Sequence, residues 1–333
     1  MRVTQVRVVA FAVAALWAAL PGARALDKVT LGTDWKAEAE HGGYYQALAT
    51  GIYKRHGIDL VLRQGGPQVN QSQLLAAGRL DFSIASNSFI PLNFLENDIP
   101  MVAVAALFQK DPAVLIAHKG VGNDSLAALK GKPIMIGGDT RVGWWLFLKA
   151  KFGYSDDQIR TYDFNIAPFL ANKQAVQQGY LTSEPFLIEK AGETPNVFLI
   201  ADQGYTSYAS LLETSQKLVR DNPDLVQRFV NASIEGWYSY IYGDPKPGND
   251  LIKQDNPEES DDLLAYARAK MKEYGIVDSG ESEKEGIGAM TDARWKDFFD
   301  VMSQQGLYPK DMNYRAAYSL RFVNHRVGME LKK

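Results

Sequence analysis

Apolar runs alternate with amphipathic stretches along the chain from residue 26 onward. Runs at 29–31, 58–63, 81–85 and 101–108 predict strands. Between them, Tyr44, Ala47, Leu48, Gly51 and Ile52 recur at the spacing of a helix face packed on a sheet, and another helix is predicted over 68–77. The continuous apolar run at 101–108 is typical of a strand covered on both faces. This alternation predicts an α/β fold with a parallel-rich sheet flanked by helices.

The same alternation starts again after residue 111. Strands are predicted at 113–117, 133–136, 162–164 and 197–200, and helices near 125–129, 142–152 and 169–178. The remainder reads as mostly helical, with helices over 223–242, 261–274 and 294–304. About 300 residues exceed what one hydrophobic core usually organises. We therefore expect two lobes with a cleft between them, one beginning with 26–110 and the other formed by 111–203.

The first 25 residues have the pattern of a secretory signal peptide. Arg2 and Arg7 precede an apolar run at 8–20, and the small-residue pattern at 23–25 predicts cleavage near Ala25. The apolar run is shorter than the roughly 20 residues that a transmembrane helix needs. We therefore expect the mature protein to be exported.

Composition narrows the chemistry that the chain can perform. It has no cysteine, which excludes disulfides, thiolate metal sites and cysteine nucleophiles within the chain. Charges of both signs are interspersed, and no basic block points to nucleic acid or to an anionic membrane as a partner. The nucleophile elbow, the P-loop and the paired-histidine zinc motif are all missing from the sequence. We expect a binding protein without a metal or an organic cofactor, not an enzyme.

Candidate ligand-binding residues lie where predicted strands run into helices. In open α/β sheets, ligands bind beyond the carboxyl ends of the strands. The residues near these junctions combine hydroxyls, amides and a few charges with aromatic faces, which suits a flat polar ring. The candidates are Trp35, His41, Tyr44, Gln68, Ser86, Asn87, Phe108, Thr140, Arg141, Trp144, Asn165 and Glu184.

Several of these residues have an ordinary structural interpretation as well. His41 precedes a helix N-terminus and could hydrogen-bond a solute as a neutral imidazole, or be a simple surface histidine. Glu184 could accept from an amine or could merely start a helix. Arg141 could pair with a ligand anion or with a carboxylate of the facing lobe. Adjacent Trp144 and Trp145 point about 100° apart on a helix, and we favour Trp145 for the core.

Several motifs together resemble the nitrate/taurine/thiamine-pyrimidine-precursor family of ABC-importer substrate-binding proteins. The most specific are TDW at 33–35 and HGGYYQA at 41–47, and the others are GIY at 51–53, QLLAAG at 73–78, TSEPF at 182–186 and NPDLVQRF at 222–229. The resemblance implies a two-lobed periplasmic-binding-protein fold in which 204–333 returns to the first lobe. It also implies a periplasmic monomer that closes on a small-molecule solute and docks on an ABC permease of the inner membrane.

The pyrimidine branch of this family implies roles for individual residues. There, Trp35 would stack on an aminopyrimidine, His41 would hydrogen-bond it, and Glu184 would read its amino edge. The sequence KAEAE at 36–40 departs from the Pro/Asn-rich turn of that branch, so a sulfonate, nitrate, riboflavin or an aromatic carboxylate is an alternative cargo. One relative is a pyrimidine synthase that depends on a cysteine-rich motif, whereas this chain has His41 but no cysteine.

Overall fold

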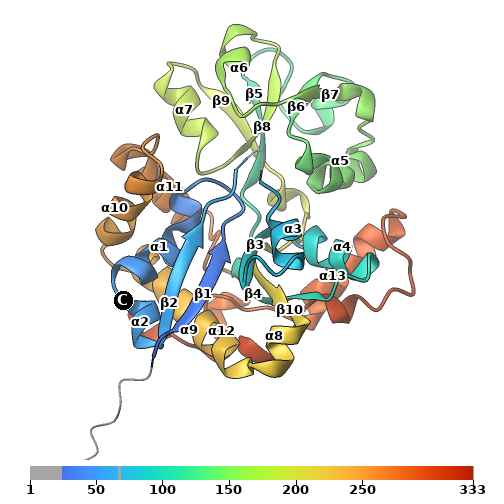
Figure 1. The fold of residues 1–333 in the computed structure, drawn as a ribbon. Helices are drawn as coiled ribbons and strands as arrows, with labels where there is room; N and C mark the ends of the chain where they lie inside the picture. The colour runs from blue at the N-terminus through green and yellow to red at the C-terminus, as the bar shows by residue number, and fades with distance from the viewer. Residues whose placement is uncertain (1–24, 67–68, 333) are drawn as a thin grey trace, which may run out of the picture.

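Two sheets of five strands, each flanked by helices, organise the chain (Figure 1). The computed structural model describes residues 25–66 and 69–332. The architecture confirms the α/β fold class and the two lobes expected from the sequence. The predicted signal peptide and the candidate Gln68 lie outside the described residues.

The first sheet has the strand order β2-β1-β3-β10-β4. Its strands are β1 (Asp27–Gly32), β2 (Ile58–Arg63), β3 (Phe82–Asn87), β4 (Met101–Phe108) and β10 (Ala209–Ser215). β1 pairs in parallel with β2 and β3, whereas β10 is antiparallel to both β3 and β4. Every residue of β4 is buried, as its apolar run predicted. β10 was missed, because its mixed sequence ASLLETS lacks the apolar alternation that marks a strand.

The second sheet has the strand order β7-β6-β8-β5-β9. Its strands are β5 (Ala113–His118), β6 (Ile134–Ile136), β7 (Ile159–Thr161), β8 (Val176–Tyr180) and β9 (Pro195–Leu199), with β5 antiparallel to both of its neighbours. The predicted strand at 162–164 was wrong by three residues. The predicted helix at 169–178 was also wrong, because α6 (Ala167–Ala171) ends early and the following residues form β8. A short buried strand and a buried helix segment share the same apolar signal.

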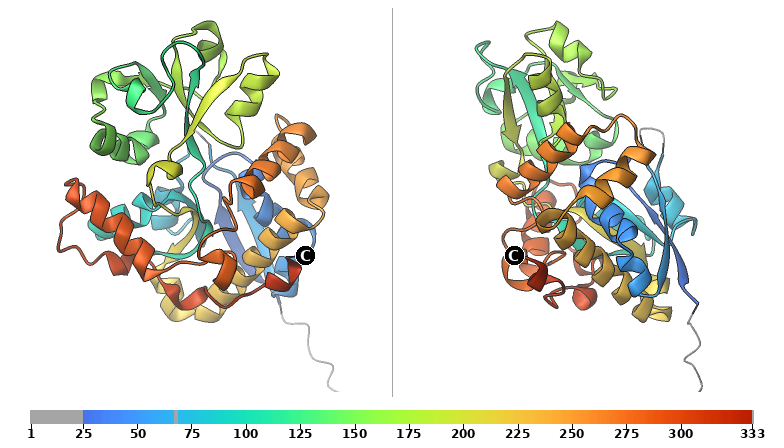
Figure 2. Two further views of the ribbon diagram at one scale, coloured as in Figure 1. Left: turned by 180° about the vertical axis from the view of Figure 1, so that it is seen from behind. Right: turned by 90° about the vertical axis from the view of Figure 1, so that its left-hand side faces the viewer.

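Helices cover both sheets and continue to the C-terminus. Those of the N-terminal and central parts are α1 (Gly42–Ala49), α2 (Ile52–Arg55), α3 (Gln71–Ala76), α4 (Phe89–Glu96), α5 (Trp144–Phe152), α6 and α7 (Glu184–Lys190). The C-terminal helices are α8 (Gln216–Asp221), α9 (Pro223–Tyr242), α10 (Lys246–Asp255), α11 (Asp261–Glu273), α12 (Ser282–Glu285) and α13 (Asp292–Gln304). Most of them pack on the lobe of β1–β4, and α10 and α11 reach toward the other lobe (Figures 1 and 2). Within the described residues, no helix has the length and apolar character to cross a membrane.

Two segments, 109–112 and 200–208, connect the sheets, and we call them the crossing segments (Figure 2). Arg294 of α13 lies against both. Its Nε donates to the Thr206 carbonyl at 2.9 Å, and its Nη2 donates to the Ser207 carbonyl at 3.1 Å and to the Gln109 carbonyl. Nη1 lies 3.2 Å from the Glu281 carboxylate. One guanidinium therefore ties the two crossing segments to the C-terminal helices.

The glycine pair of the HGG motif sets the distance between α1 and α9. A Cβ on Gly43 would lie 2.3 Å from ring atoms of Trp237, and one on Gly42 would lie 2.1 Å from the Tyr240 ring. On the facing helix, a Cβ on Gly236 would lie 2.3 Å from the Gly43 carbonyl oxygen. Real Cβ atoms do not approach heavy atoms this closely. These glycines therefore allow two helices to pack in close contact behind the candidate site.

Replacing Gly43 with Ala should lower the free energy of unfolding by about 1–3 kcal/mol, because the added methyl overpacks a core that cannot open without moving α9. Urea denaturation measures the change. Gly138→Ala is the matched control, since Gly138 has φ −62° and nothing within 4 Å of its Cβ position. Equal stabilities for the two variants would contradict this account of the motif.

Candidate functional site

A small cavity lies between the two lobes, and we call it the cleft cavity. Its accessible volume is about 10 Å³, which is room for about one water molecule. The second lobe contributes Tyr180 at the end of β8, and the first lobe contributes Asp34, Glu38, Glu40, His41, Phe108 and Ser210. Pockets that hold small ligands usually measure about 300–1,000 Å³. A solute larger than a few atoms therefore requires the lobes to separate before it enters.

The turn between β1 and α1 supplies most of the cleft cavity. A 3₁₀ turn at Ala39–His41 runs directly into α1. The connection from β1 to this turn contacts the end of β3. His41 Nε2 lies 2.9 Å from Asp34 Oδ1, and the Ser86 hydroxyl donates to Asp34 Oδ2 at 2.7 Å. The His41 side chain is only 2% exposed. A neutral imidazole that donates from Nε2 to this carboxylate keeps an acceptor lone pair at Nδ1.

Two aromatic side chains, one from each lobe, are in contact beside this turn. The rings of Trp35 and Phe164 have centroids 4.5 Å apart and planes inclined by 51°. Phe164 has φ +63°, a left-handed backbone that a bulky residue rarely adopts. Such outliers cluster at ligand-binding and catalytic sites, where the surrounding structure holds them in place. Nearby, the Thr182 hydroxyl of the second lobe donates to the Glu40 carboxylate of the first.

Carboxylates dominate the charge of the site. Burial, together with the negative charges of Glu40 and Asp34 among others, raises the pKa of Glu38 well above its ordinary value. Burial is also the main cause of the raised pKa of Glu40, although the hydrogen bond from Thr182 opposes it. Burial raises the pKa of Glu184 as well, in spite of the hydrogen bond from the Tyr180 N–H at 2.8 Å. In the part of the chain that the structure describes, no lysine or arginine forms an ion pair with these carboxylates.

Several buried polar atoms at the site have no hydrogen-bond partner among the described residues. They are His41 Nδ1, the Tyr44 hydroxyl and the Ser210 hydroxyl. Tyr44 packs edge-on against Trp237, with its ring fully buried. Ser210 has φ +45°, the second left-handed non-glycine residue at the site. Unpaired buried polar groups are rare in folded proteins and call for a partner such as a ligand or a bound water.

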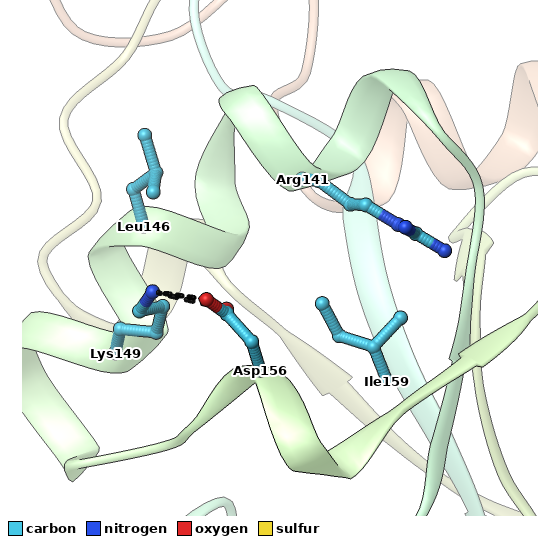
Figure 3. A pocket seen from close by; sticks show the side chains of 5 residues that line it. All are labelled: Arg141, Leu146, Lys149, Asp156 and Ile159. Carbon is cyan, nitrogen blue, oxygen red and sulfur yellow. Dashed lines mark hydrogen bonds and ion pairs between the residues drawn. The ribbon is translucent and has the colours of Figure 1, made fainter.

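Arg141 lies away from the cleft cavity, although the sequence favoured it as a cleft cation. It is exposed on the second lobe and lines a surface depression with Leu146, Lys149, Asp156 and Ile159 (Figure 3). Lys149 donates to Asp156 at 2.8 Å, as the dashed line in Figure 3 marks. Trp145 also donates to Asp156, at 3.0 Å, and it is fully buried, as expected for a core residue. Asp156 is therefore paired with Lys149, while Arg141 forms no ion pair with any residue that the structure describes.

The other candidates occupy varied positions. Asn165 is exposed, and its side-chain oxygen accepts from the Ala167 N–H at the start of α6. Asn87 similarly accepts from the Phe89 N–H at the start of α4. Thr140 is half-buried in the 3₁₀ turn before α5, and Trp144 is 5% exposed in the hydrophobic core. The structure thus brings together Trp35, His41, Tyr44, Ser86, Phe108 and Glu184, while Arg141 and Asn165 stand apart from them.

Sequence reasoning missed several residues that line or flank the cleft cavity: Asp34, Glu38, Glu40, Phe164, Tyr180 and Ser210. Glu38 and Glu40 could have been predicted from the sequence, because they alternate directly before a predicted helix and so place two carboxylates at one junction. Ser210 could not be found, since it belongs to the strand that was missed. Within residues 25–66 and 69–332, no group of three metal-ligating side chains is placed to hold an ion.

Comparison with known proteins assigns the architecture to a family. The chain is 26% identical over 306 residues, 90% of its length and 86% of the relative's, to the riboflavin-binding protein RibY of Chloroflexus aurantiacus. It is 26% identical over 255 residues, 68% of its length and 73% of the relative's, to the 4-amino-5-hydroxymethyl-2-methylpyrimidine phosphate synthase of Schizosaccharomyces pombe. The periplasmic aliphatic sulphonate binding protein SsuA of Escherichia coli has the same fold, with a TM-score of 0.65 and 13% identity over 87% of this chain and 91% of that one.

The structural similarity shows that the chain has the fold of periplasmic binding proteins. The model of the NMT1/THI5-like family matches residues 38–247, which is more than half of the chain. The matched span contains the glutamates and histidine of the cleft cavity, the glycine pair behind it, and both crossing segments. The chain therefore belongs to the NMT1/THI5-like family.

Proposed function

We propose that this protein is the periplasmic substrate-binding component of an ABC importer and that it binds a small aromatic or heterocyclic solute without turnover. The observations that carry the proposal are the cleft cavity between the lobes and the contact between Trp35 of the first lobe and Phe164 of the second. Closure of two lobes on a solute creates a form that a permease distinguishes from the open one. A solute that bridges both lobes stabilises the closed form.

The aromatic pair supports a flat solute. A ring stacked between two others needs more room than the 4.5 Å that separates the Trp35 and Phe164 centroids. The ring therefore enters an open form and lies against Trp35 as the lobes approach. Phe164 then covers its other face. The strained backbone of Phe164 is consistent with a residue held in position for contact with a ligand.

Polar groups around the aromatic pair orient the solute. His41 Nδ1 accepts from a ring or amino N–H, because Asp34 already occupies Nε2. Glu184 receives hydrogen bonds from the Tyr180 N–H and from the Tyr162 hydroxyl at 3.3 Å, which fix its carboxylate near the cleft. The remaining lone pairs of this carboxylate accept hydrogen bonds from an amino group of the solute. An aminopyrimidine presents such a donor edge beside a flat ring.

The identity of the cargo has a second candidate. The relative from Chloroflexus aurantiacus is named for riboflavin, and its similarity covers 90% of this chain. The facing aromatic rings suit a flavin as well as a pyrimidine. A flavin is larger, so it requires a wider separation of the lobes. The Schizosaccharomyces pombe relative is named as a pyrimidine phosphate synthase, and our proposal of binding without turnover predicts that this protein forms no pyrimidine phosphate.

Replacing Trp35 with Ala should weaken binding of an aromatic solute about tenfold to a hundredfold, because loss of one stacking face costs about 1–3 kcal/mol. Calorimetric titration of the mature protein with 4-amino-5-hydroxymethyl-2-methylpyrimidine and with riboflavin measures the change. Trp35→Phe is the matched control and should retain most of the affinity. Mass spectrometry of a co-purified ligand identifies the cargo directly. Binding of alkanesulfonates alone, unaffected by Trp35→Ala, would contradict the proposal.

A further inference from the structure

We propose that the solute is a cation, such as an amidinium or a protonated amino-heterocycle, and that Glu38 is its counter-ion. This inference rests on the proposed function, because it describes the charge of the solute that the same cleft takes. The geometry that points to it is a cleft cavity walled by carboxylates and by the buried His41, whose Nδ1 has no hydrogen-bond partner among the described residues. A ligand with positive charge and several N–H donors complements such a wall.

The first step of the argument concerns charge balance. Asp34, Glu38 and Glu40 line the cleft cavity, and Glu184 lies close enough to affect the pKa of Glu38. The basic side chain nearest to them is His41, whose Nε2 already contacts Asp34 at 2.9 Å. Across the described ranges, the ion pairs of lysine and arginine involve other acids, such as Lys36 with Glu258. Closing the lobes therefore buries negative charge that no side chain neutralises, which is costly unless a proton or a cation accompanies it.

The second step identifies the carboxylate that is free to bind. Asp34 accepts from His41 and Ser86, Glu40 accepts from Thr182, and Glu184 accepts from Tyr180. The Glu38 side chain has no hydrogen bond to any residue that the structure describes, although it lines the cleft cavity. A carboxylate in this position has its full acceptor capacity available. It can bind an amidinium or ammonium group through charge-assisted hydrogen bonds.

The third step is independent of the carboxylates. His41 Nδ1 lines the cleft cavity, is buried, and lacks a hydrogen-bond partner among the described residues, and the buried Ser210 hydroxyl, which lies near the Tyr44 hydroxyl, belongs to the same lining. Exposure is 2% for the His41 side chain and 6% for Ser210. With Nε2 committed to Asp34, Nδ1 of a neutral His41 is an acceptor. The carboxylates and this Nδ1 are acceptors, and a sulfonate or nitrate would leave them unpaired, whereas the Ser210 hydroxyl can either donate or accept.

The aromatic walls support the same conclusion. A cation over the face of tryptophan or phenylalanine is attracted by the negative face of the ring. Trp35 and Phe164 can thus hold a flat cation by its faces while Glu38 holds its edge. Neutral aromatics gain only the stacking contribution, and anions are repelled by the carboxylates.

The test compares three compounds that share one ring and differ in charge: benzamidine, benzamide and benzenesulfonate. Calorimetric titration of the mature protein at neutral pH should show benzamidine binding at least about tenfold more tightly than benzamide, and benzenesulfonate not binding. Glu38→Gln should reduce the preference for benzamidine about tenfold to a hundredfold. Glu283→Gln, at an exposed position of α12, is the matched control and should leave the preference unchanged.

Three outcomes would overturn the proposal: equal affinity for benzamidine and benzamide, tighter binding of benzenesulfonate, or no binding of any of the three at millimolar concentration. If Glu38→Gln does not fold, Glu184→Gln serves as a second variant and should reduce the same preference. The proposed function is judged separately by Trp35→Ala. If the affinity for aromatic solutes depends on Trp35 but not on the charge of the solute, the receptor proposal stands and the cationic cargo is rejected.

Discussion

Replacing Arg294 with Ala is expected to lower the free energy of unfolding by about 3–5 kcal/mol, the range for removing one partner of a buried, hydrogen-bonded charge pair. The guanidinium is 17% exposed and donates to carbonyl oxygens of Thr206, Ser207 and Gln109 while contacting Glu281. The variant leaves the three carbonyl oxygens without this donor, and Glu281 keeps only the hydrogen bond from the Thr291 hydroxyl at 3.2 Å. It also removes the contact of the guanidinium with the Tyr208 ring, 4.1 Å from its centroid. Urea denaturation followed by circular dichroism measures the loss.

Arg294→Lys should recover only part of this stability, because one ammonium cannot reach carbonyls on both crossing segments in the way a planar guanidinium does. Arg315→Ala is the matched control, since Arg315 forms an exposed ion pair with Asp292 at 3.4 Å, and such pairs contribute about 0–1 kcal/mol. If Arg294→Ala costs no more than Arg315→Ala, the two crossing segments are held by other contacts.

Replacing Glu213 with Gln is expected to stabilise the protein increasingly as the pH rises above about 5. Glu213 lies in the middle of β10, is fully buried, and neither of its side-chain oxygens has a hydrogen-bond partner among the described residues. Burial alone raises the pKa of its carboxyl well above the ordinary value of 4.5. The folded protein therefore holds this proton to a higher pH than the unfolded chain does. Stability is lost as the pH rises from the unfolded pKa toward the folded one.

The expected size of the Glu213 effect follows from proton linkage. Each pH unit in that window costs the unsubstituted protein about 1.4 kcal/mol of stability relative to the Glu213→Gln variant, which has no proton to release at this position. Comparing urea denaturation of both proteins at about pH 5 and about pH 7 gives the change in their difference. Glu283→Gln, which alters an exposed acid, should show no such pH-dependent difference. A constant difference between the two proteins at both pH values would mean that Glu213 is ionised in the fold.

Much of the fold could be predicted from local pattern. The apolar run of β4, the amphipathic stripe of α1 and the Pro223 start of α9 each carry a signal that depends on a few neighbouring residues. The prediction failed at β10 and β8, which pair with strands remote in sequence. Their environment is set by partners that no local window contains.

The candidate site, like the fold, could be predicted only in part from local pattern. Residues at junctions, such as Trp35, His41 and Glu184, could be found because strand ends and helix starts are visible in the sequence. Arg141 had the same local signal, yet it lies beside Asp156 on the surface of the second lobe. Which junctions face the cleft depends on how the two sheets are turned toward each other. That orientation is decided by the crossing segments and by the helices packed against them.

The sequence by itself determined the fold class, the absence of cysteine chemistry, and which aromatic and acidic side chains are available to line a cleft. These features depend only on composition and on short-range periodicity. The tertiary structure decided that Glu38 and Glu40 gather with Asp34 and His41, that Trp35 meets Phe164, and that Ser210 completes the wall. The contact between Trp35 and Phe164 joins the two lobes, Ser210 comes from a strand remote in sequence, and the energy of a charge or a ring depends on what surrounds it in space.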